Sequence, residues 1–157
     1  MPNIERRPPR PTATLMITRQ RENGVEVLLG NRSESMPSFP GYWAFPGGGV
    51  SRVDTAASES LGISVQHCAI LREVVEELGL APQAGRLVKV DNDFRGMVVD
   101  DKANWFPLAL DGDIPCDTSG MRIISMRTTP PFGPIRFENT FLPVSYTHLT
   151  LPTNGCV

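Results

Sequence analysis

The clearest hydrophobic pattern in the chain is a helical one near its middle. Apolar residues recur there at spacings of three and four, as on one face of an α-helix: Leu71, Val74, Val75 and Leu78. Gly79 follows directly, at the position where helices commonly end with a left-handed residue. The spacing therefore predicts a helix over residues 71–78 with a buried apolar face.

Alternating and β-branched patterns on both sides of this helix indicate strands. Strands are expected at residues 12–18, 26–30, 86–90, 121–127 and 135–142. Asn23-Gly24, between the first two, is a typical hairpin turn. The last two would form a late hairpin. The pattern predicts a domain of mixed α and β structure.

Composition limits the class of protein. A chain of 157 residues can bury the core of one domain. A formal net charge of -2 gives no electrostatic case for nucleic acid as a partner, and no apolar run approaches the roughly 18 residues of a membrane span. Residues 1–11 are basic and proline-rich, without the apolar core of a signal peptide, and are expected to form a flexible arm. We expect a cytoplasmic protein without membrane or nucleic-acid partners.

Three glutamates share the other face of the predicted helix. Glu73, Glu76 and Glu77 lie three and four residues apart, so they repel one another by about 0.2–0.5 kcal/mol per pair. A hard cation such as Mg²⁺ takes oxygen ligands and would turn this repulsion into a binding site. An ordinary solvated acidic face is the alternative. The site is favoured by Phe45-Pro46-Gly47-Gly48 upstream, a turn whose backbone can approach a phosphate or a metal.

These motifs together resemble the signature of the Nudix hydrolases, G-x5-E-x7-R-E-U-x-E-E-x-G-U, where U is a bulky aliphatic residue. The second half matches in full, from Arg72 to Leu80. In the first half, Gly48 is followed after five residues by Asp54 instead of glutamate, and the gap from Asp54 to Arg72 is longer than seven residues. Residues 55–66 are therefore expected to be an inserted surface loop or short helix.

In these departures the sequence resembles one branch of the family, which includes the peroxisomal coenzyme A diphosphatases. That branch shares the Phe-Pro-Gly-Gly turn, the aspartate and the insertion. The coenzyme A enzymes have a further pattern before this turn: Arg-Ser, then an arginine, then a glycine, each separated by three residues. Arg32-Ser33 and Gly41 match it, but Pro37 occupies the position of the second arginine. Nucleotide sugars, dinucleoside polyphosphates and damaged nucleoside triphosphates therefore remain open as substrates.

The resemblance covers about residues 12–142 and implies a fold and an activity. The fold would be α+β, an α-β-α sandwich with a mixed β-sheet between helices. The activity would be hydrolysis of a diphosphate bond in a nucleoside diphosphate linked to another moiety, with a small-molecule substrate. A non-catalytic sensor of the same fold that binds a nucleotide is the alternative.

The resemblance also implies roles for single residues. Glu76 and Glu77 would bind Mg²⁺ or Mn²⁺, and Glu73 would be a further ligand or the general base, so all three are candidate catalytic residues. Gly48 would offer its carbonyl to the metal. Structural support is expected from Arg72, Asp54 and Gly79, and substrate contacts are expected from Arg32, Gly47, Gly48 and Arg136.

Two positions near the glycine turn have alternative interpretations. Arg32 follows a predicted strand, where it could meet a phosphate or simply occupy a surface turn. Trp43 could stack on a nucleobase, but a core position under the glycine turn is the more ordinary expectation.

The C-terminal residues 143–157 have no counterpart in the family. They resemble the translation of sequencing-adapter DNA, so the expected domain is incomplete at its C-terminal end, with a late strand and a final helix missing. A genuine irregular extension is the alternative.

Overall fold

The structure is a computed structural model that describes residues 8–36, 39–133 and 135–146. Its centre is a mixed five-stranded sheet with the order β2-β1-β9-β8, in which β5 also pairs with β1. The strands are β1 (Arg10–Arg21), β2 (Gly24–Val27), β5 (Gly47–Gly49), β8 (Ser125–Thr128) and β9 (Phe137–Ser145). Only the β1–β9 pair is parallel among these pairings.

The long strand β1 organises the sheet. One of its edges pairs first with β5, at residues 12–14, and later with β2, at residues 18–21. Its alternate residues Ala13, Leu15 and Ile17 are buried in the core. The chain between β2 and β5 leaves the sheet and forms a small separate pair, β3 (Gly30–Asn31) with β4 (Trp43–Ala44).

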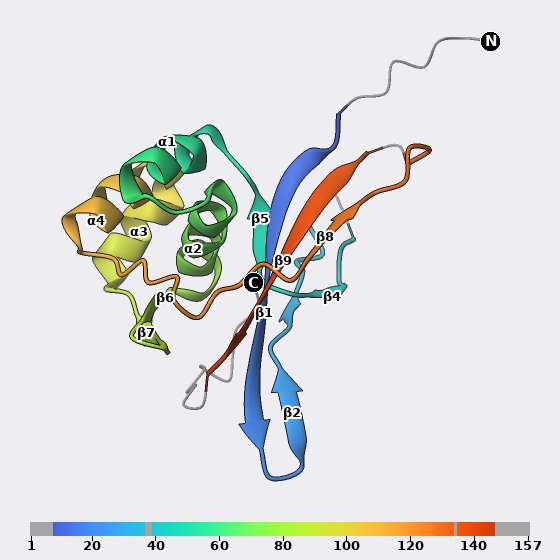
Figure 1. The fold of residues 1–157 in the computed structure, drawn as a ribbon, viewed down its shortest axis with the longest axis horizontal. Helices are drawn as coiled ribbons and strands as arrows, with labels where there is room; N and C mark the ends of the chain where they lie inside the picture. Colours follow the sequence, from blue (N-terminus) through green and yellow to red (C-terminus); the bar gives the residue numbers. More distant parts are fainter. Residues whose placement is uncertain (1–7, 37–38, 134, 147–157) are drawn as a thin grey trace.

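The helices lie on one side of this sheet (Figure 1). They are α1 (Arg52–Leu61), α2 (Val65–Leu78), α3 (Asn92–Asp100) and α4 (Trp105–Asp111), with a 3-10 turn at Lys102–Asn104. A short hairpin of β6 (Leu80–Gln83) and β7 (Arg86–Lys89) follows α2. The mixed sheet and the α+β class agree with the predicted fold, although the described helices cover one side of the sheet and not both. None of the described helices is both long and apolar enough to span a membrane.

The central helix α2 begins earlier than its apolar pattern predicts. Ser64 caps it, because the Ser64 hydroxyl accepts the backbone N–H of His67 at 3.2 Å. The helix ends as expected at Gly79, whose φ of 65° is left-handed and whose N–H donates to the Val75 carbonyl at 2.9 Å. Cys68 belongs to the buried face of the helix, so the predicted start at residue 71 is wrong by six residues, because Val65 already begins it.

The insertion at residues 55–66 was expected to be a surface loop or a short helix, and the structure contains the helix. Residues 55–61 belong to α1 and the rest leads into α2, and Ala57 is fully buried. The Ser58 hydroxyl also donates to the Ile63 carbonyl at 2.6 Å, which ties the end of the helix to the turn. The small side chains that suggested a loop instead allow α1 to pack closely against α2.

Two further differences concern elements after α2. Helices α3 and α4 were not predicted from the sequence, although Asp91 caps α3 by accepting the N–H of Asp93 at 2.8 Å. Strand β9 continues three residues past its predicted end at Leu142, because it pairs with β1 as far as Ser145 and buries Val144. The remaining predicted tail, residues 147–157, and most of the predicted arm lie outside the described residues.

Candidate active site

The glycine turn before α1 lies directly on the sheet. Gly47 pairs with Thr14 of β1 and has a φ of 150°, and a Cβ at this position would lie 2.2 Å from the Ala13 carbonyl oxygen. Only glycine fits such an approach. The backbone N–H of Gly47 donates to Oε2 of Glu77 at 3.1 Å, so the turn fixes one carboxylate of α2.

The next glycine lies against a second carboxylate. A Cβ on Gly48 would come within 2.4 Å of both Cδ and Oε1 of Glu73. The absence of a side chain therefore lets the Glu73 carboxylate lie against the turn. Two of the three predicted catalytic glutamates thus contact the predicted phosphate turn.

Arg72 holds this arrangement together from inside. Its side chain is 2% exposed and forms a two-pronged ion pair with the fully buried Asp54, with Nε–Oδ1 at 2.8 Å and Nη2–Oδ2 at 2.9 Å. Its Nη1 donates to Glu73 and to Glu76, each at 2.9 Å. Its Nη2 also donates to the Gly49 carbonyl at 3.1 Å. One guanidinium therefore joins α1, α2 and the glycine turn.

The electrostatics of this cluster follow from burial. Burial alone would lower the pKa of Arg72, but its bonds to Asp54 and the charges of Glu73 and Glu76 raise that pKa above its ordinary value. Burial raises the pKa of Glu73, against the opposing charge of Arg72. Burial also raises the pKa of Glu77 to about 7, although the N–H of Gly47 opposes the shift. Glu77 can therefore hold or release a proton near neutral pH.

A pocket of about 110 Å³ opens beside Glu77. It is lined by Gly30, Asn31, Arg32, Ser33, Met36, Ala44, Phe45, Pro46, Gly47 and Glu77. The positive charge of Arg32 partly opposes the raised pKa of Glu77, so the two side chains are close enough to interact electrostatically. The structure thus brings the predicted substrate residues Arg32 and Gly47 to one pocket with a predicted catalytic carboxylate.

Arg136 is not among the residues that line this pocket. It precedes β9, and its Nε donates to the Thr129 carbonyl at 3.3 Å within the hairpin that joins β8 to β9. The predicted substrate role of Arg136 therefore gains no support from the geometry.

The oxygen atoms at the site are of the chemical type that binds a hard divalent cation. Three carboxylates on one helix and a backbone carbonyl at a side-chain-free turn are oxygen ligands of the kind that Mg²⁺ prefers. They do not converge as a ready-made cluster, and no group of three acidic, histidine or cysteine side chains poised for a metal occurs among the described residues. Instead, Glu76 is directed to Arg72, and Glu77 to Gly47.

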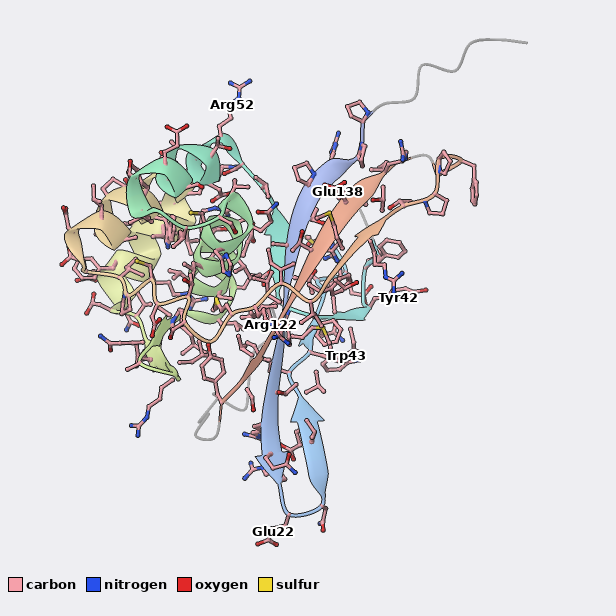
Figure 2. The ribbon with its side chains drawn as sticks, viewed as in Figure 1. Glu22, Tyr42, Trp43, Arg52, Arg122 and Glu138 are labelled. Carbon is pink, nitrogen blue, oxygen red and sulfur yellow. The ribbon has the colours of Figure 1, made fainter. Side chains whose placement is uncertain are left out.

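Two features of the site were missed or misread from the sequence. Arg95 of α3 donates from Nη2 to the carbonyl oxygens of Glu76 at 3.0 Å and Glu77 at 3.2 Å, and no motif pointed to it. Trp43 is 66% exposed, so the expected core position is wrong. Figure 2 shows Trp43 and Tyr42 near β4, on the side of the sheet away from the helices.

Comparisons with solved structures support the fold. A crystal structure of a NUDIX hydrolase from Alicyclobacillus acidocaldarius matches with a TM-score of 0.78 at 24% identity, over 95% of this chain and 75% of that one. A MutT/nudix family protein from Enterococcus faecalis matches with a TM-score of 0.50 at 17% identity, over 96% of this chain and 42% of that one. In a complex of the C-terminal domain of mouse MUTYH with human PCNA, the TM-score is 0.51 at 14% identity, over 94% and 70% of the chains. These likenesses concern the fold.

No curated protein matches the chain. The model of the NUDIX domain family matches residues 8–115, well over half of the sequence, and these residues contain the glycine turn, Asp54 and all of α2. The chain therefore belongs to the NUDIX domain family, and the prediction of a hydrolase that acts on pyrophosphate bonds is confirmed at that level.

Proposed function

We propose that the protein hydrolyses the pyrophosphate bond of a nucleoside diphosphate linked to another moiety, with Mg²⁺ or Mn²⁺ as its cofactor. The observation that carries this proposal is the position of Glu77. Its half-buried carboxylate accepts the backbone N–H of Gly47 and lines a pocket that Arg32 also lines. An anion binder, a titratable carboxylate and an open cavity are the parts that attack on a diphosphate requires.

The proposed metal ligands are Glu73, Glu76, Glu77 and the Gly48 carbonyl. A bound divalent ion would neutralise the charge of the diphosphate and lower the pKa of a water molecule. The guanidinium of Arg32 would pair with a phosphate oxygen, and the wall of the pocket at Phe45 and Pro46 would limit the access of water.

Either Glu73 or Glu77 would take the proton from the attacking water. Burial raises the pKa of both carboxyls. In the metal-free protein the pKa of Glu77 is about 7, so its carboxylate can accept a proton near neutral pH when it is not bound to the metal. Arg72 and Asp54 are proposed as structural support, because their ion pair fixes the helix face from which the three glutamates project.

A coenzyme A-like substrate is the finer part of the proposal. It is supported by Arg32-Ser33 and by the glycine turn, both of which line the pocket. The aspartate and the insertion of the related branch are also present, as Asp54 and the second half of α1. Pro37 replaces an arginine of the coenzyme A pattern, so nucleotide sugars and dinucleoside polyphosphates belong in the same test.

A panel of diphosphates tests the activity. Purified protein is incubated with coenzyme A, a nucleotide sugar and a dinucleoside polyphosphate, with and without Mg²⁺, and the phosphate-containing products are separated. We expect Mg²⁺-dependent cleavage of at least one substrate. The Glu76→Gln, Glu77→Gln double variant should lose about 10²–10⁴-fold in turnover while remaining folded. Binding of a nucleotide without cleavage would favour the sensor alternative.

A further inference from the structure

Arg95 contacts the last turn of α2. It belongs to α3, and its Nη2 donates to the carbonyl oxygens of Glu76 at 3.0 Å and Glu77 at 3.2 Å. The last carbonyls of a helix have no partner within the helix. Arg95 therefore supplies that partner at two proposed metal ligands.

The end of α2 is shaped to admit this side chain. A Cβ on Gly79 would lie 2.9 Å from Cδ of Arg95, so the glycine that ends the helix also leaves room for the arginine. The Nε of Arg95 is buried and has no hydrogen-bond partner among the described residues. Leaving a buried donor unpaired is unfavourable, so the two bonds of Nη2 must offset this cost for the side chain to lie here.

Glu76 and Glu77 are therefore held from two directions. Their side chains are fixed by the guanidinium of Arg72 and by the Gly47 N–H. Their backbone carbonyls are fixed by Arg95. The carboxylates of two adjacent residues can reach one ion only if the backbone that carries them is oriented correctly. The contact of Arg95 therefore controls the placement of both carboxylates.

We propose that Arg95 is a positioning residue, which sets the backbone of Glu76 and Glu77 and thereby the affinity for the divalent ion. This inference rests on the proposed metal-dependent function. It differs from an ordinary helix cap, which would change the stability of the protein and leave metal affinity unchanged.

The test measures Mn²⁺ binding to the full chain by electron paramagnetic resonance, well below the unfolding temperature. Arg95→Met should weaken Mn²⁺ binding by at least fivefold. Arg95→Lys should give an intermediate affinity, because an ammonium group still donates to a carbonyl but without the fixed planar geometry. The matched control is Asn104→Ala, which removes a bond from Nδ2 to the Met97 carbonyl at 2.8 Å near the end of α3. It should leave the affinity unchanged.

Each outcome decides the inference. Equal Mn²⁺ affinity in the wild type and Arg95→Met would overturn the role of Arg95 and leave the proposed function intact. An equal loss in Asn104→Ala would show that general destabilisation is the cause, and would also overturn it. No Mn²⁺ binding by the wild type would instead overturn the proposed function. If Arg95→Met does not fold, Arg95→Lys decides alone: weakened binding supports the role, and wild-type binding refutes it.

Discussion

Two regions near the pocket, a helix side and a loop side, are built on different principles. On the helix side, Arg72 and Asp54 form a buried ion pair that also fixes the glutamates of α2. On the loop side, the start of β4 and the chain before it expose three aromatic residues, Phe39, Tyr42 and Trp43, by 67%, 64% and 66%. Phe39 and Tyr42 touch edge to face, with ring centroids 5.7 Å apart. The helix side is fixed internally, whereas the loop side presents apolar surface outward.

The difference separates two requirements of an enzyme of this class. Chemistry at a phosphorus centre needs carboxylates held in place, and buried charge-assisted hydrogen bonds do this. Selection of the group attached to the phosphate needs an exposed surface that can contact it, and large aromatic side chains provide such contact area. Substitutions should therefore change folding on the helix side and substrate affinity on the loop side.

The largest effect is expected at the buried ion pair. Arg72→Met leaves the carboxylate of Asp54 buried without its partner, and removes the donors to Glu73 and Glu76. Breaking a buried pair in this way typically costs about 3–5 kcal/mol of unfolding free energy. Urea unfolding followed by circular dichroism would measure it.

A double variant provides the control. Asp54→Leu combined with Arg72→Met removes both charges, so it should recover part of the stability lost in the single variant. Metal binding should remain impaired, because Glu76 still lacks the donor that orients it. A double variant less stable than Arg72→Met alone would mean that the buried pair is not the source of the loss.

The second prediction compares two neighbouring glycines. Gly47→Ala places a Cβ against the backbone of β1 at an unfavourable φ, and should cost roughly 2–3 kcal/mol of stability. Gly48→Ala meets only the flexible end of Glu73, which can turn away. It should therefore cost under about 1 kcal/mol while reducing turnover at least tenfold. Thermal unfolding and turnover of both variants test the contrast, which fails if Gly48→Ala retains full activity.

The same contrast explains which features could be predicted from the sequence. The three glutamates Glu73, Glu76 and Glu77 lie on one helix and the Phe-Pro-Gly-Gly residues in one turn. Both features depend on residues close in sequence, so the motif was sufficient to predict them. The ion pair of Arg72 with Asp54 was not evident, because Asp54 lies in another helix and their contact depends on how α1 packs against α2. Arg95 acts on backbone carbonyls, and such contacts leave no pattern of side-chain types.

The misread elements have the same physical origin. The small residues of α1 left a loop and a short helix open, because the burial at Ala57 comes from tertiary packing and not from an apolar stripe. Trp43 read as core because aromatic residues usually are, yet β4 pairs only with the short β3 and leaves its side chain largely exposed.

The third prediction concerns pH and the helix side alone. The pKa of Glu77 is raised from 4.5 to about 7, so the folded protein holds this proton more tightly than the unfolded chain does. The resulting stability is present in full below about pH 4.5 and is lost as the pH rises through 7, with a total of roughly 1–3 kcal/mol. In the metal-free protein, the contribution of Glu77 to the free energy of unfolding should therefore be smaller at pH 8 than at pH 5.

The Glu77→Gln variant isolates that contribution. Glutamine does not titrate, so the variant should lose the part of the pH dependence that Glu77 supplies. Urea unfolding of both proteins in a chelating buffer at pH 5 and pH 8 measures the difference. The same pH dependence in both proteins would show that Glu77 has an ordinary pKa in the folded state.

The smallest effect on stability is expected on the loop side. Trp43→Ala removes an exposed ring that lies outside the core, so the free energy of unfolding should change by no more than about 0.5 kcal/mol. The residue is adjacent to Ala44 and Phe45 of the pocket wall. If the ring contacts the group attached to the diphosphate, the variant should raise KM several-fold with kcat nearly unchanged, because this contact would be equal in the ground state and the transition state.

The control is Val27→Ala. Val27 is an exposed apolar residue of β2 that does not line the pocket, so this variant should leave KM unchanged. A fall in kcat for Trp43→Ala with KM constant would place Trp43 in the chemistry of the helix side and remove the distinction between the two sides.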